Sequence, residues 1–194
     1  MKALLLNGER NKEKNLERFA DIIIEQLMNF NYELENILLR EKEIADCLGN
    51  FKCWTKTPGK CIIDDFGNNI LSLYNDSDLF ILLNPITFGG YSYQIKKALD
   101  RLIPVSIPIF DNENGDYFYK KRNTHAPALI GIGIMGEKNT EEEKLFYRLL
   151  NRNGFNLRLP FYRGLVFDNK DKNEEISKNL ELLLKEIGDI HERS

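Results

Sequence analysis

An unbroken apolar run, Leu79-Phe80-Ile81-Leu82-Leu83, leads directly into a turn marked by Pro85, Gly89 and Gly90. A run of this length with apolar side chains on both faces predicts a central strand of a parallel sheet that is covered on both sides. In open α/β sheets, ligands bind at the loop between such a strand and the next helix, because backbone N–H groups and the positive helix end converge there. The loop is therefore a candidate site. The alternative is an ordinary turn that needs two glycines.

The segment after this loop predicts a helix that Ser92 can cap and that stops before Pro104. Its apolar residues recur at helical spacing, and its charged residues fall on the other side, which we expect to face solvent. The apolar set is Ile95, Ala98, Leu99 and Leu102, and the charged set is Lys96, Lys97, Asp100 and Arg101.

The remaining chain alternates strand and helix patterns, which predicts a doubly wound parallel sheet with helices on both faces. The other predicted strands cover residues 2–6, 32–39 and 128–134, with a last strand near 157–159 or 165–167. Segment 32–39 is the most polar of them, which indicates the edge of the sheet.

Four more helices are expected from apolar spacing and capping residues. The first buries Leu16, Phe19, Ala20, Ile23 and Leu27; a short second one is opened by Asp64 and Asp65 and buries Ile70, Leu71 and Leu73. The third is capped by Thr140 with Glu143 and buries Leu145, Phe146, Leu149 and Leu150, and the closing helix ends near Gly188.

The length of 194 residues and a hydrophobic content of 42% fit a single compact domain over residues 1–194. There are 27 Lys and Arg residues against 30 Asp and Glu, and the net charge of -3 gives no basic field that points to nucleic acid. The sequence has neither a signal-peptide core nor a membrane-spanning stretch, so we expect a cytoplasmic protein without a membrane partner.

Three segments carry a resemblance to a known group. The run from Pro85 to Arg101 resembles the flavin loop of the NAD(P)H-dependent FMN reductase and iron-sulfur flavoprotein group in the flavodoxin-like superfamily. Segment 47–65 resembles that group's cysteine-bearing loop, and Asn7-Gly8-Glu9-Arg10 stands where its phosphate loop would stand. The resemblance implies a flavodoxin-like five-stranded sheet of order 2-1-3-4-5, with the ligand in the crevice between the first and third strands.

The same resemblance implies FMN as the cofactor and assigns residues to it. Gly8, Arg10 and Asn15 would hold the phosphate, and the polar edge of the flavin ring would lie along Pro85, Ile86, Thr87, Phe88 and Gly89. Relatives often have an aromatic residue in place of Thr87, and Phe88 or Trp54 could replace that stacking contact. Catalytic residues are not identified, because the group's chemistry is carried by the cofactor.

The phosphate loop departs from the group's pattern at Glu9, which replaces a serine, and at Leu16, where a hydroxyl residue is usual. Two like charges about 4 Å apart repel by roughly 4 kcal/mol at an effective dielectric constant near 20, which corresponds to about a thousandfold in affinity. Arg10, Lys12 and Lys14 could compensate, or Glu9 could point away. If Glu9 opposes the phosphate, Glu9→Ser should tighten FMN binding.

The implied function is an FMN-binding, NAD(P)H-dependent oxidoreductase that passes hydride or electrons through flavin to an unknown small-molecule or protein acceptor. A homo-oligomer, specifically a homodimer, is expected. The alternative is a flavodoxin-fold protein that has lost FMN binding and serves as a binding or scaffold subunit, and Glu9, Leu16 and Thr87 motivate it.

Cys47, Cys53 and Cys61 form an odd, clustered set that does not indicate a secreted disulfide framework. Thiolate-bound iron-sulfur clusters normally need four cysteines, and Asn50 stands where the cluster-bearing members have one of theirs. A three-cysteine zinc site would also need a histidine. We therefore expect neither a metal nor an iron-sulfur cluster, and the thiols would pack as small apolar groups. A cluster completed by another group is the alternative.

A polar stretch with several aromatic residues, 108–125, is too long for a minimal connection and is predicted to be functional or mobile. Its cations Lys120, Lys121 and Arg122 could meet the 2′-phosphate of NADPH or could form a solvated face. His125 is interpreted as a loop histidine.

Overall fold

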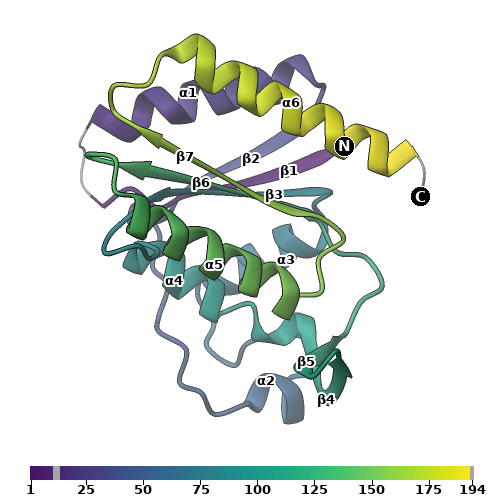
Figure 1. Ribbon diagram of the computed structural model, residues 1–194. Helices are drawn as coiled ribbons and strands as arrows, with labels where there is room; N and C mark the ends of the chain where they lie inside the picture. Colours follow the sequence, from purple (N-terminus) through teal and green to yellow (C-terminus); the bar gives the residue numbers. More distant parts are fainter. Residues whose placement is uncertain (11–13, 193–194) are drawn as a thin grey trace.

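The computed structural model describes residues 1–10 and 14–192, and its centre is a five-stranded parallel sheet (Figure 1). The spatial order is β2-β1-β3-β6-β7, which confirms the flavodoxin-like order expected from the sequence. The strands are β1 (Lys2–Asn7), β2 (Glu33–Leu38), β3 (Leu79–Pro85), β6 (Ala128–Met135) and β7 (Tyr162–Asp168). The polar strand β2 lies at the edge, as its composition predicts.

Helices cover both faces of the sheet, which is why the central strands are apolar along their whole length. Figure 1 shows α1 (Lys14–Asn29) and α6 (Asn173–Glu192) on one face, and α3 (Phe66–Asn75), α4 (Tyr93–Asp100) and α5 (Thr140–Asn156) on the other. Along β1, Ala3 and Leu5 pack in the core on the α1 and α6 side, whereas Leu4 and Leu6 pack in the core on the α3 and α4 side. This alternation follows from the period of two in a strand.

The segment after α4 forms a separate two-stranded hairpin that the sequence reading did not identify. Its antiparallel strands are β4 (Ser106–Glu113) and β5 (Asp116–Lys121). They are joined by Asn114 and Gly115, whose φ angles of 54° and 89° match the two-residue type I′ turn. Asn-Gly between β-prone residues is a strong short-range hairpin signal, so the sequence did contain the information.

Of the two places left open for the last strand, 165–167 is confirmed, and one predicted helix boundary is wrong. The last strand is β7, so the alternative at 157–159 fails: Leu157 is the C-cap of α5 and Leu159 packs in the core beyond it. The closing helix α6 does not end near Gly188 but continues to Glu192. It continues because Ile187 is buried and Ile190 packs against the same core, which outweighs the weak helix propensity of glycine.

Helix α5 begins and packs differently from the expectation. Its N-cap is Asn139, not Thr140, and the Asn139 side chain accepts hydrogen bonds from the N–H groups of Glu141 and Glu142. Phe146 and Leu150 are buried as predicted, but Leu145 and Leu149 are 45% and 42% exposed. The helix thus presents apolar side chains to solvent next to the hairpin and the glycine loop.

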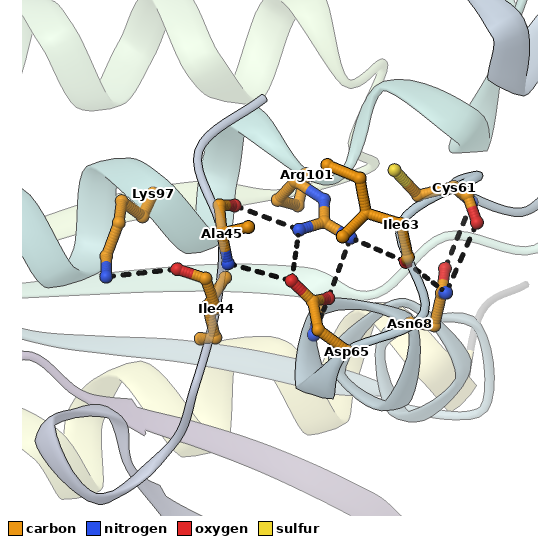
Figure 2. A network of polar contacts seen from close by, with 9 residues as sticks. Ile44, Ala45, Cys61, Ile63, Asp65, Asn68, Lys97 and Arg101 are labelled. Carbon is orange, nitrogen blue, oxygen red and sulfur yellow. Dashed lines mark hydrogen bonds and ion pairs between the residues drawn. The ribbon is translucent and has the colours of Figure 1, made fainter. Parts of the chain in front are cut away.

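Arg101, predicted to face solvent, is 2% exposed and belongs to the interior; Figure 2 shows its polar contacts. It follows buried Ala98 by three residues and buried Gln94 by seven, so it shares their helix face. Its guanidinium forms a two-pronged ion pair with Asp65, with N–O distances of 2.7 and 2.8 Å. It also donates to the backbone oxygens of Ala45 and Ile63. Through these bonds, Arg101 holds the backbone at Ala45 and at Ile63, on the two sides of the cysteine-bearing segment, against the C-terminal end of α4.

Asp65 also caps α3, because its carboxylate accepts a hydrogen bond from the N–H of Gly67 at 2.9 Å. The same carboxylate accepts a second hydrogen bond from the N–H of Ala45 at 2.7 Å. The sequence predicted the helix-start function but not the ion pair. Burial alone raises the pKa of Asp65, but the hydrogen bonds from Arg101 and from these two N–H groups outweigh burial and hold the pKa below its ordinary value. The carboxylate is therefore ionised over the whole neutral range.

The pKa shift predicts a specific acid sensitivity. A carboxylate with a lowered folded-state pKa stabilises the fold above its unfolded pKa, and this stabilisation is lost as the pH falls through the folded pKa. We expect the urea midpoint of the wild type to fall more steeply than that of Asp65→Asn between about pH 4 and pH 2. Asp64→Asn is the control, because that side chain is 92% exposed and should keep the wild-type slope. Equal slopes for Asp65→Asn and the wild type would contradict the assignment.

Candidate functional site

The glycine loop between β3 and α4 is organised by a buried amide, Asn84, at the end of the strand. Asn84 is fully buried, and its Oδ1 accepts from the N–H of Ser92 at 2.7 Å. Its Nδ2 donates to the backbone oxygen of Gly90 at 3.3 Å. The Asn84 side chain therefore fixes the backbone at Gly90 and Ser92, where the loop leads into α4. Asn84 was not among the site residues expected from the sequence, although a polar residue directly after a buried strand is a visible signal.

The centre of the loop is a tight turn over residues 87–90. Thr87 and Gly90 exchange backbone hydrogen bonds of 3.3 and 2.9 Å, and the φ angles of Phe88 and Gly89 are 51° and 73°. Positive φ at both central positions defines a type I′ turn. An aromatic residue in this conformation costs roughly 1–2 kcal/mol, and such strain is typical of functional loops. Phe88 is nevertheless 89% exposed, so the turn presents its ring to solvent.

Gly89 and Ser92 fix the loop to its neighbours. A Cβ atom on Gly89 would lie 2.7 Å from the Cβ of Leu145, and the Gly89 N–H points to Glu142 Oε2 at 3.3 Å. Ser92 caps α4 as predicted, accepting from the N–H of Ile95 at 3.4 Å. Pro85 ends β3, and the Ile86 N–H donates to the oxygen of Ile134 in β6 at 2.9 Å. The loop is thus held by α4, α5 and β6 together.

The loop after β1 lies directly against this one. The Gly8 N–H donates to the Leu83 oxygen at 2.9 Å. A Cβ atom on Gly8 would lie 2.4 Å from Ile95 Cγ1 and 2.7 Å from Ser92 Oγ, so only glycine allows this approach. The Arg10 guanidinium lies 5.6 Å from the ring centroid of Tyr93. Two loops that are far apart in sequence therefore meet at the carboxyl edge of the sheet, as the resemblance implies.

Lys97 adds a second cation at Tyr93, with its Nζ 5.5 Å from the ring centroid. Asn15 falls in the first turn of α1, but its side chain lies outside the described residues, as does that of Lys14. Lys12 lies outside the described chain altogether. Among the described residues, Arg10 and Lys97 are thus cations that lie at the Tyr93 ring, and Lys97 Nζ also donates to the Ile44 oxygen at 3.1 Å.

Glu9 is buried and forms an ion pair with Arg40. Arg40 belongs to the short helical turn η1 (Leu39–Glu41), which follows β2, and β2 runs parallel to β1 with Leu38 opposite Asn7. Because of this pairing, Arg40 lies beside the loop that follows β1. The Glu9 N–H also donates to Asn7 Oδ1 at 3.0 Å, which fixes the loop backbone. The negative charge of Glu9 is thus compensated by Arg40, which was not among the residues expected to do so from the sequence.

The three cysteines of segment 47–61 line one small cavity of about 30 Å³ together with Ile103. Cys47 is exposed, and Cys53 and Cys61 are half-buried. Burial first, and then the neighbouring thiols of Cys61 and Cys47, raise the pKa of the Cys53 thiol. Among residues 1–10 and 14–192, no group of three or more His, Cys, Asp or Glu side chains is placed to hold a metal ion. The packing function of the thiols stays a prediction.

The aromatic and basic residues of segment 108–125 contact the protein's own backbone and hairpin. Trp54 stacks on Phe51 at a centroid distance of 4.7 Å and contacts the tilted ring of Tyr119 at 4.8 Å, so it supports the hairpin rather than a ring beside Phe88. Arg122 donates to the oxygens of Pro104 and Ser106. His125 Nε2 lies 2.7 Å from the oxygen of Ser77. The proposed contact of the basic residues with a 2′-phosphate stays a prediction.

The fold and the two adjoining loops define a cofactor-binding protein of the doubly wound α/β class. The family model of the NADPH-dependent FMN reductases matches residues 1–134, and the chain belongs to this family. An iron-sulfur flavoprotein of Archaeoglobus fulgidus is 24% identical over 98% of this chain and 94% of the relative. One from Methanocaldococcus jannaschii is 34% identical, over 55% of this chain and 54% of the relative.

Solved structures share the fold at low sequence identity. An NAD(P)H:quinone oxidoreductase from Methanothermobacter marburgensis has a TM-score of 0.70 at 8% identity and covers 95% of this chain and 97% of its own. An FMN-dependent NADH-azoreductase from Bacillus anthracis, solved with FMN, has a TM-score of 0.65 at 14% identity and covers 100% of this chain and 99% of its own. These likenesses confirm the flavodoxin-like architecture.

The family makes FMN the cofactor, with NAD(P)H as co-substrate. The geometry fits a phosphorylated ligand, because the cations Arg10 and Lys97 lie at the Tyr93 ring beside the loop after β1, and Arg40 neutralises Glu9. Over the described residues, no helix is both long and apolar enough to cross a membrane.

Proposed function

We propose that this chain is an FMN-binding oxidoreductase that takes reducing equivalents from NAD(P)H and delivers them to a small-molecule or protein acceptor. The observation that carries the proposal is the junction of the Gly8 loop and the glycine loop at the carboxyl edge of the sheet. Bound FMN supplies the redox chemistry, and the chain's residues bind and orient it. No acid-base pair is required of the protein.

Each loop has a distinct part in this proposal. Gly8, Arg10 and Asn15 bind the phosphate, while Arg40 keeps Glu9 neutralised beside them. The backbone from Pro85 to Gly89 holds the ring system, because a fixed type I′ turn presents its peptide groups in one orientation.

Asn84 and Ser92 are positioning residues, since they fix the return of this loop onto α4. Homodimer formation and the cytoplasmic compartment stay predictions, and light scattering of the purified protein tests the first.

The alternative function, a flavodoxin-fold scaffold that no longer binds FMN, rested mainly on the charge of Glu9. A bare carboxylate in the phosphate loop would oppose an anionic ligand, but the Glu9 carboxylate already has a guanidinium partner. The loop therefore presents a neutral pair to a phosphate. FMN binding by the chain is the expectation that follows.

The proposal predicts a yellow protein. We expect the purified chain to show flavin absorption bands after incubation with excess FMN and desalting, and NAD(P)H should bleach these bands under anaerobic conditions. Comparing the bleaching rates with NADH and NADPH identifies the preferred co-substrate. A spectrum without flavin bands, both before and after incubation, would refute FMN binding, and retained bands that neither nucleotide bleaches would refute the oxidoreductase function.

A further inference from the structure

A cavity of about 480 Å³ lies between α4, the β4–β5 hairpin and the second half of α5. Close-packed interiors contain few voids larger than a water molecule, and ligand pockets are typically about 300–1,000 Å³. The cavity is thus of ligand size. It is open to solvent, because Leu149, Phe110 and Tyr117 on its walls are 42%, 62% and 67% exposed.

This cavity is separate from the proposed FMN site. Its walls include none of the residues from Gly8 to Arg10 and none from Pro85 to Gly90. It begins at Tyr91, directly after the glycine loop, and follows α4 toward the hairpin at the other end of that helix. In Figure 1, the hairpin labels β4 and β5 lie beside the C-terminal end of α5, far from the loop that opens α4.

The walls are mainly aromatic and aliphatic. Tyr91, Phe110, Tyr117, Phe118 and Tyr119 supply five rings. Such walls favour a flat aromatic ligand, because ring pairs gain about 0.5–1.5 kcal/mol beyond the burial of their area. The hairpin supplies four of these rings, which gives this two-stranded element a function beyond connecting α4 to β6.

Charges at the cavity are balanced. Lys96 and Asp100 both line it and form an ion pair with each other. Arg152, on the opposite wall, is paired with Asp116 of the hairpin at 2.8 Å. A charged ligand would find no unmatched partner among these four residues and would lose its hydration on entry. An uncharged ligand is favoured.

One polar group can orient such a ligand. Asn153 Nδ2 donates to the Tyr91 hydroxyl oxygen at 3.1 Å, and both residues line the cavity. Since the hydroxyl is the acceptor in this bond, its own proton is left to donate to a second partner. Burial raises the pKa of Tyr91 to about 12, so the hydroxyl keeps this proton at neutral pH.

We propose that this cavity is a second ligand site, for an uncharged aromatic molecule of two or three fused rings that carries a carbonyl oxygen. The rings pack between the hairpin and the helices, and the oxygen accepts the hydroxyl proton of Tyr91. The proposal does not depend on FMN binding, because none of the residues assigned to FMN lines the cavity.

Calorimetric titration with 2-acetylnaphthalene, with and without FMN, tests the site. We expect saturable binding to the wild type, weaker binding of the anionic 2-naphthoate, and affinity about 2- to 10-fold lower in Tyr91→Phe, the range of one neutral hydrogen bond. Leu149→Trp, at a half-exposed position on the wall, should fill the cavity and abolish binding. Tyr147→Phe is the matched control, because Tyr147 is on α5 but outside the cavity, and it should bind like the wild type.

The absence of saturable binding to the wild type would overturn the proposal, and so would wild-type affinity in both Tyr91→Phe and Leu149→Trp. Thermal unfolding of each variant, together with FMN binding, shows that the fold is retained. If a second copy of the chain covers the cavity instead, Leu149→Trp will lower the mass measured by light scattering while the ketone fails to bind, which also overturns the proposal.

Discussion

Arg101→Met is expected to lower the free energy of unfolding by about 3–5 kcal/mol, the range for breaking a buried ion pair by removing one partner. Arg101 is almost completely buried, and its guanidinium bonds to both carboxylate oxygens of Asp65. Methionine fills similar space but leaves the Asp65 carboxylate and the backbone oxygens of Ala45 and Ile63 without these donors (Figure 2). The loss should come from desolvated, unmatched polar groups rather than from a cavity.

Urea unfolding of the wild type and the variant measures this loss, and Arg152→Met is the control. Arg152 forms an ion pair of similar length with Asp116, at 2.8 Å, but its side chain is 51% exposed, so its loss should cost at most about 1 kcal/mol. The double variant Asp65→Asn/Arg101→Met removes the unmatched charge and should be more stable than Arg101→Met alone. An effect of Arg101→Met no larger than that of Arg152→Met would show that the buried pair is not a major source of stability.

The sheet could be predicted from the sequence because its signals are local. The apolar runs 2–6, 79–83 and 128–134 each have strand length, and Ser92 and Asp65 stand where helix caps are expected. The spatial order of the strands came from the resemblance and agrees with the structure. The hairpin could also have been predicted, because Asn114-Gly115 is a turn signal that acts within four residues.

The site could be predicted only in part, because its charged partners are distant in sequence. Arg40 and Glu9 are separated by 31 positions, and Arg101 and Asp65 by 36. The charge of Arg101 suggested an outer position, although its spacing from Ala98 places it on the buried face of the helix, and the ion pair with Asp65 makes this burial possible. Likewise, only the parallel pairing of β1 with β2 brings Arg40 to the phosphate loop. Tertiary ion pairs of this kind leave no periodic signal in one sequence.

Arg40→Gln is expected to weaken FMN binding by about a hundred- to a thousandfold, if the proposed phosphate site is correct. The substitution leaves the Glu9 carboxylate without its guanidinium partner beside an incoming phosphate. Like charges about 4–6 Å apart repel by roughly 3–4 kcal/mol at an effective dielectric constant near 20, which corresponds to this change in affinity. Quenching of flavin fluorescence on titration measures the dissociation constant, at a temperature where the variant is folded.

Glu9→Gln and Glu9→Ser should act in the opposite direction, because they remove the negative charge and leave the Arg40 guanidinium for the phosphate. Both should tighten FMN binding, and both should destabilise the free protein, since the half-buried Arg40 loses its ion pair with Glu9. Glu41→Gln is the control, because Glu41 lies 3.9 Å from Arg40 but is 59% exposed. It should leave the affinity within about twofold of the wild type.

The double variant Glu9→Gln/Arg40→Gln separates two functions of Arg40. If Arg40 acts only by neutralising Glu9, then Arg40→Gln should have little effect once Glu9 is uncharged, and the two substitutions will be strongly coupled. If the guanidinium binds the phosphate directly, Arg40→Gln will weaken binding in both backgrounds. Equal FMN affinity in the wild type and in Arg40→Gln would instead place the phosphate away from Glu9, and the loop after β1 would then not be the phosphate site.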